Sequence, residues 1–187
     1  MDQHTIFTIF HILGVAVGAG GAFLSDAMFF SSVKDERISR TEMRFLFLGG
    51  KMVWIGIAIL LVSGLFLVFE NPQRYLASSK FLAKMTIVAV IILNGAVFHL
   101  HHIPRLYRHA GHHFPSSDEF MRKAPFLLGS GVVSVVSWVS ALVLGASHKL
   151  PYGYFTIMAG YLVILALALV ISQLLKKRII AHPKKRP

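Results

Sequence analysis

The sequence contains five long apolar stretches, and these limit the possible folds more than any other feature. They run over residues 6–30, 45–69, 81–100, 126–147 and 152–175. Each holds 20 to 25 residues, and a helix needs about 20 apolar residues to cross the hydrocarbon core of a bilayer. Membrane β-strands are shorter and alternate between apolar and polar residues. The pattern therefore predicts an all-α, polytopic transmembrane bundle of five helices, as a single domain over residues 1–187.

Short polar and proline motifs mark where the predicted helices begin and end. Ser39 followed by Glu42 is a capping box, which opens the second helix. Pro72 ends that helix, because proline cannot continue it. Pro125 begins the fourth helix, and Pro151 separates the fourth helix from the fifth. The last two helices are therefore predicted to form a tight hairpin.

Basic residues are divided unevenly between the two predicted sides of the membrane. The chain has 19 Lys and Arg residues against 8 Asp and Glu, which gives a net charge of +11. Four of the 19 fall on the side of the N-terminus, and the other 15 on the opposite side. Because cytoplasmic loops carry the excess of Lys and Arg, the N-terminus is predicted outside and the C-terminus in the cytoplasm. We expect a multi-pass protein of the bacterial inner (cytoplasmic) membrane.

A basic run over residues 176–187 predicts contact with lipid. It directly follows the fifth apolar stretch, where anionic headgroups attract Lys and Arg side chains. The lipid bilayer is therefore the first expected partner, and nucleic acid is not expected as one. A redox partner and a second copy of the chain both remain open as further partners.

Ionisable side chains are costly inside a bilayer, so each one within a predicted span is a candidate functional residue. His11 lies five residues into the first span, and Lys84 lies three residues into the third, both counted from the outer end. At about 1.5 Å of rise per residue, both sit roughly 5–8 Å below the outer edge. His148 follows the outer end of the fourth span. We therefore expect these three side chains to gather near one face of the membrane.

His11 shares one face of its helix with glycines. Gly14, Gly18 and Gly21 follow it at helical spacing. Glycines allow a flat macrocycle to approach closely, and small residues are also the usual seam between transmembrane helices. Two interpretations are therefore open for Gly14 and Gly18, which either border a bound cofactor or pack against another helix.

These features favour a non-covalently bound b-type haem, with one or more per chain. Imidazole is a common axial ligand, and helix bundles hold cofactors between facing helices. The chain has no Cys, which excludes thioether attachment and thiolate ligation. His11 is the expected axial ligand of the haem iron, with Lys84 or His148 as the second. A cytochrome b-like protein of this kind would have a redox or electron-transfer role, and a haem-dependent oxidoreductase is one form of it.

Simpler explanations remain open for the same polar residues. His11 could form a hydrogen bond to a facing helix. Lys84 could reach the outer headgroups or pair with Glu70. Asp26 and Lys51 lie at similar depth from the cytoplasmic side, and could form a structural ion pair or a proton relay. In a structural subunit of a larger membrane complex, which is a further candidate function, this pair would make interface contacts.

Six histidines crowd the stretch over residues 99–113. Imidazoles bind Zn, Cu and Ni, and histidine-rich tracts often bind metals. The alternative function is therefore non-enzymatic handling of copper or another transition metal. Its cytoplasmic ligands would be His99, His101, His102, His109, His112 and His113. Their spacing matches no defined tetrahedral site, so a basic, pH-responsive contact with headgroups also remains open.

The segment Phe10-His-Ile-Leu-Gly, followed by Gly20 and Gly21, resembles the first helix of two small membrane families. These are the HemJ-type protoporphyrinogen oxidases and the CopD-like copper-resistance membrane proteins. In HemJ-type proteins, a haem-ligating His in the first helix and a Lys in the third are essential. His11 matches that His, and Lys84 in Phe81-Leu-Ala-Lys-Met matches that Lys. The resemblance covers about the first three helices and implies haem binding at His11.

Overall fold

The computed structural model describes residues 2–34, 39–104, 118–148 and 150–180, and these residues form a helical bundle. The helices are α1 (Gln3–Lys34), α2 (Arg40–Glu70), α3 (Pro72–Leu76), α4 (Ser79–Val97), the π-helical turn η1 (Phe98–His102), α6 (Asp118–Ala146) and α7 (Tyr154–Ile180). Within the described ranges, five helical segments are long and apolar enough to cross a membrane. The all-helical class and the five long helices predicted from the sequence are confirmed.

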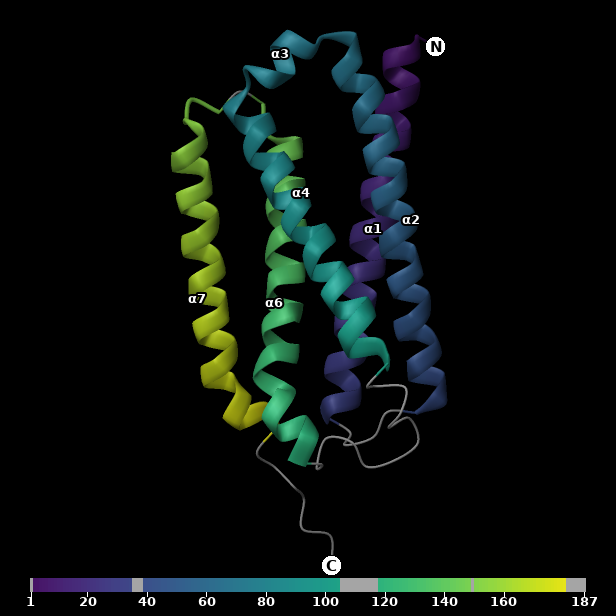
Figure 1. The fold of residues 1–187 in the computed structure, drawn as a ribbon, viewed down its shortest axis with the longest axis vertical. Coiled ribbons are helices and arrows are strands. Elements are labelled where there is room, and N and C mark those ends of the chain that lie inside the picture. The colour runs from purple at the N-terminus through teal and green to yellow at the C-terminus, as the bar shows by residue number, and fades with distance from the viewer. Residues whose placement is uncertain (1, 35–38, 105–117, 149, 181–187) are drawn as a thin grey trace, which may run out of the picture.

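The long helices lie side by side and alternate in direction (Figure 1). The start of α1, α3, the end of α6 and the start of α7 lie at one end of the bundle, and the end of α7 lies at the other. Helices α1 and α2 make the most extensive helix pair, and α6 packs against both α4 and α7. The N-terminal end of this bundle is called the outer end below, after the predicted orientation.

Local sequence signals set several helix ends. The capping box that opens α2 is confirmed: the Ser39 hydroxyl accepts from the Glu42 backbone N–H at 3.1 Å, and the Glu42 carboxylate accepts from the Ser39 N–H at 2.7 Å. Pro72 lies just beyond the end of α2 and begins the short helix α3. The prediction that Pro125 begins the fourth helix is wrong, because α6 starts at Asp118 and contains that proline. An internal proline removes one backbone donor, and a long helix tolerates this loss.

The Ser39→Ala variant is expected to lower the free energy of unfolding by about 1 kcal/mol, because the first turn of α2 loses a side-chain acceptor. SDS titration of the detergent-solubilised protein, followed by circular dichroism, measures this change. Thr41→Ala is the matched control, since Thr41 is an exposed residue in the same turn. Equal stabilities for the two variants would contradict the role given to the cap.

Glycines bring α1 and α2 close together. A Cβ added at Gly21 would lie 2.6 Å from the Met52 Cβ and 2.7 Å from the Gly49 carbonyl oxygen. A Cβ added at Gly56 would lie 2.7 Å from the Gly14 carbonyl oxygen. These separations are shorter than side chains allow, so the two backbones pack directly against each other. The helix-packing interpretation of the glycine face is therefore the one seen between these helices.

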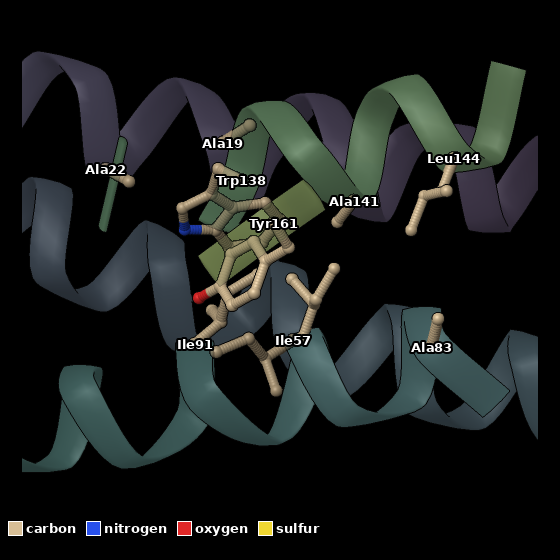
Figure 2. Close-up of a cluster of buried hydrophobic side chains, with 10 residues drawn as sticks. Ala19, Ala22, Ile57, Ala83, Ile91, Trp138, Ala141, Leu144 and Tyr161 are labelled. Carbon is tan, nitrogen blue, oxygen red and sulfur yellow. The ribbon is translucent and has the colours of Figure 1, made fainter. Parts of the chain in front are cut away.

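The core sits where the long helices converge on Trp138 of α6. Figure 2 shows the Trp138 indole and the Tyr161 ring of α7 beside Ile57 of α2 and Ile91 of α4. Trp138 is 3% exposed, and the buried Ser137 hydroxyl is 2.9 Å from the Tyr161 hydroxyl. Large apolar side chains also cover the outside of the bundle. Phe155 is 84% exposed, a surface that fits contact with lipid rather than water.

Candidate functional site

The fold brings His11 of α1 and Lys84 of α4 into contact. The Lys84 Nζ lies 3.4 Å from the His11 Nε2, and both side chains are partly buried in the outer half of the bundle. The two residues are 73 positions apart in the chain. The sequence predicted them at similar depth near one end of the bundle, and their contact agrees with a similar depth.

Ser63 of α2 sets the orientation of the His11 ring. Its oxygen lies 3.1 Å from the His11 Nδ1, and its hydroxyl donates to the Ile59 carbonyl at 2.6 Å. A hydroxyl has one hydrogen to give, so the Ser63 oxygen accepts from Nδ1–H. The Nε2 atom then carries the lone pair of the ring and faces the Lys84 amine, which can donate to it. The bond to Ser63 is the hydrogen bond to a facing helix that was one of the simpler explanations for His11. It uses only Nδ1, one of the two ring nitrogens.

Small residues on two helices make room for this pair. A Cβ added at Gly64 of α2 would lie 3.3 Å from the His11 Cε1. A Cβ added at Gly145 of α6 would lie 3.6 Å from the Lys84 Nζ. The site is therefore formed by α1 and α4, which supply the nitrogen atoms, and by α2 and α6, which supply the space beside them.

His148, the third predicted ligand, is not part of the pair. Its side chain is exposed, and its backbone carbonyl accepts from the Lys80 Nζ at 3.2 Å. The alternative pairing of Lys84 with Glu70 is not formed either. Glu70 instead lies 2.5 Å from the Nδ1 of His4, across α1 and α2. The amine of Lys84 thus faces an imidazole rather than a carboxylate.

Gly14 and Gly18 were candidate neighbours of a cofactor in the sequence analysis. In the structure, protein atoms fill the space beside both glycines. A Cβ added at Gly14 would lie 3.0 Å from the Ile59 side chain. At Gly18 it would lie 2.6 Å from the Trp138 indole. Both glycines therefore serve helix packing in this arrangement. Direct contact with a macrocycle at either position would require α2 or Trp138 to move.

The histidine-rich stretch is only partly described. His109, His112 and His113 lie outside the described residues. His102 is buried beside two aromatic rings, 5.5 Å from Phe98 and 5.1 Å from Phe126 between centroids, whereas His101 is exposed. Within the described part of the chain, no group of three or more His, Asp or Glu side chains is placed to hold a metal ion.

Two contacts differ from the sequence interpretation or were missed by it. The ion pair between Asp26 and Lys51 is not formed: Lys51 is exposed, with its Nζ 4.7 Å from the Phe47 ring centroid, and the Ser134 hydroxyl of α6 donates to Asp26. Ser63 was missed as the partner of His11. A signal for it exists in the line Gly49, Gly56 and Ser63, whose seven-residue spacing marks the face of α2 toward α1.

Comparisons with known protein families, with curated proteins and with solved structures give no match for this chain. The fold defines its class as an all-helical bundle whose five apolar helices fit a multi-pass membrane protein. The site adds an imidazole and an amine that meet within the apolar segments of two of these helices.

Proposed function

We propose that the protein is an integral membrane b-type haem-binding protein with a redox or electron-transfer role. The observation that carries the proposal is the orientation of His11, whose Nδ1 is held by Ser63 of α2 while Nε2 faces the Lys84 amine of α4. Metal-ligating histidines almost always donate their other ring N–H to a fixed acceptor, which sets the tautomer and the ring direction.

The donor set at this place fits haem. Imidazole nitrogen is a common axial ligand of haem iron. The second nitrogen, Lys84 Nζ, is 3.4 Å from the His11 Nε2, so both residues would be available to hold the same group. Lys84 would therefore act as the second ligand, or as the cation for a haem propionate. The haem would supply the one-electron chemistry, and the protein would orient it and exclude water.

The proposal includes an orientation and a location. The division of Lys and Arg, 4 against 15, supports an outer N-terminus and a cytoplasmic C-terminus. A bacterial inner membrane with anionic headgroups is the proposed environment, and a redox partner or a second copy of the chain is the proposed protein partner. In this orientation the His11–Lys84 pair lies toward the outer leaflet.

The test is a visible absorption spectrum of the protein purified in detergent from cells supplied with haem precursor. We expect a Soret band and a b-type pyridine haemochrome after extraction. Absence of both from folded protein would overturn the proposal. Stoichiometric Cu, Zn or Ni without haem would favour the metal-handling alternative, and co-purifying subunits without any cofactor would favour a structural role.

The Ser63→Ala variant is expected to weaken haem binding by about 10- to 100-fold, because the imidazole loses the acceptor that fixes its tautomer. Haem titration of the apoprotein measures the affinity. Ser172→Ala is the matched control, because the Ser172 hydroxyl also donates to a carbonyl of its own helix but lies on α7. Unchanged affinity in Ser63→Ala would contradict the role given to this hydrogen bond.

A further inference from the structure

A second polar region lies in the half of the bundle opposite to His11. It surrounds a cavity of about 50 Å³ between α1, α2, α6 and the segment formed by α4 and η1. Its polar lining residues are Ser25, Asp26, Asn94, His99, Ser130 and Ser134. Apolar side chains, including both tryptophans, Trp54 and Trp138, complete the wall. A polar cavity within an apolar bundle calls for a chemical explanation, since such groups are costly there.

Three buried polar atoms of this lining have no hydrogen-bond partner in the structure. They are the Ser25 Oγ, the Asp26 Oδ2 and the His99 Nδ1. Ser25 is 5% exposed, so bulk water does not reach its hydroxyl. More than nine in ten buried polar groups have a partner, and an exception usually marks a bound water or ion. The three atoms thus point to occupants of the cavity.

The remaining polar groups of the lining satisfy each other. The Asn94 amide donates to the Ser130 carbonyl at 3.0 Å, and the Ser130 hydroxyl donates to the Asn94 side-chain oxygen at 2.9 Å. Ser134 donates to the carboxyl of Asp26. These bonds hold α1, α4 and α6 together and leave the second carboxyl oxygen of Asp26 free for another donor.

The charges around Asp26 come from few groups. His99, at the start of η1, is the other titratable residue of the lining, whereas α6 contributes serines and Trp138. On α2, Lys51 follows the lining residue Gly50, but its amine lies against the Phe47 ring. Among the described residues, no Lys or Arg forms an ion pair with Asp26. A bare carboxylate would be unstable in this environment, so it needs water or a proton.

We propose that this cavity is a water-filled proton-binding site, in which Asp26 takes up a proton and water connects its carboxyl to Ser25 and His99. A single water needs about 10–15 Å³ of such space, so the cavity holds a few. One O–H bond forms on Asp26 as an O–H bond of a cavity water breaks; that water regains a proton from hydronium in the bulk solvent, so no hydroxide is left and no electron is transferred. The site shares no lining residue with the His11–Lys84 pair, so it does not depend on haem binding.

Infrared spectroscopy of the full chain in lipid films tests the proposal. Asp26 is one of 8 carboxylate residues in the chain, and the others that the structure describes lie at or near the ends of α1, α2 and α6. We expect a carboxylic-acid C=O band that rises as the pH falls, shifts rapidly in D₂O, and is lost in Asp26→Asn. The control, Asp2→Asn, removes an exposed carboxyl at the start of α1 and should leave this band in place.

A second variant, which keeps the Asp26 carboxyl, tests the proposal even if Asp26→Asn does not fold. In Ser134→Ala the band should persist and move to higher frequency, because the C=O group loses a hydrogen-bond donor. Absence of an Asp26 band over the whole pH range in which the chain stays folded would overturn the proposal, as would a band that does not respond to D₂O. A titration midpoint that shifts when Na⁺ replaces choline would also overturn it and assign the cavity to a cation.

Discussion

Protein carrying His11→Ala is expected to lose its bound haem, with the haem-to-protein ratio falling by at least about tenfold. The reason is that in the proposed haem site this residue would supply the ligand nitrogen itself, whereas loss of a supporting hydrogen bond already costs about 10- to 100-fold in metal affinity. The ratio is measured from the Soret absorbance and the pyridine haemochrome of equal amounts of purified protein. Size-exclusion chromatography shows whether the variant remains folded.

The matched control for this experiment is His4→Ala on the same helix. His4 lies at the outer end of α1 and contacts Glu70, away from the Lys84 amine. It should therefore retain the haem of the unmodified protein. If His11→Ala and His4→Ala have the same Soret band, His11 is not the ligand. Lys84→Met then separates the two roles of the amine: a changed band position indicates a ligand, and reduced occupancy with an unchanged band indicates a propionate contact.

The Gly56→Ala variant should destabilise the bundle by about 3 kcal/mol, at the upper end of the cost of overpacking. The added methyl group would lie 2.7 Å from the Gly14 carbonyl oxygen and closer still to the backbone of Gly18. Backbone atoms cannot change rotamer as a side chain can, so α1 and α2 must move apart along their length. SDS titration followed by circular dichroism measures the lost free energy of unfolding.

Gly20→Ala provides the comparison for this effect. Gly20 lies in the middle of α1, but no atom lies within 4 Å of a Cβ placed there. Replacing glycine by alanine in an open helical position usually stabilises a helix by roughly 0.5–1 kcal/mol. The two variants should therefore change stability in opposite directions. Similar effects at both positions would show that α1 and α2 do not pack as closely as described.

The sequence predicted the helices well because each long helix has its own local signal. Twenty or more apolar residues predict a long helix, and the capping box at Ser39 predicts where one begins. The similar depth of His11 and Lys84 was also accessible, since depth along a helix follows from residue counting, but the choice of Lys84 over His148 as the neighbour of His11 was left open. These predictions needed no knowledge of how the helices pack against one another.

The contacts that the sequence did not predict depend on how each helix is rotated about its axis. Asp26 and Lys51 lie at similar depth, but they face different directions. Asp26 of α1 contacts Ser134 of α6, whereas Lys51 of α2 is exposed and lies against the Phe47 ring. Ser63 became the partner of His11 because glycines allow α1 and α2 to pack with that face inward. Rotation is set by packing among all the helices, and residue counting along one helix does not determine it.

The π-helical turn η1 has a consequence for the directions of the side chains around it. Its last bond runs from the Ile103 N–H to the Phe98 carbonyl, five residues back rather than four. Such a turn accommodates one residue more than an α-helix would, and each residue rotates a helix by about 100°. A relative without this extra residue would align with a one-position gap near residues 98–102. In that relative, the side chain at the place of His102 would no longer face the ring of Phe126.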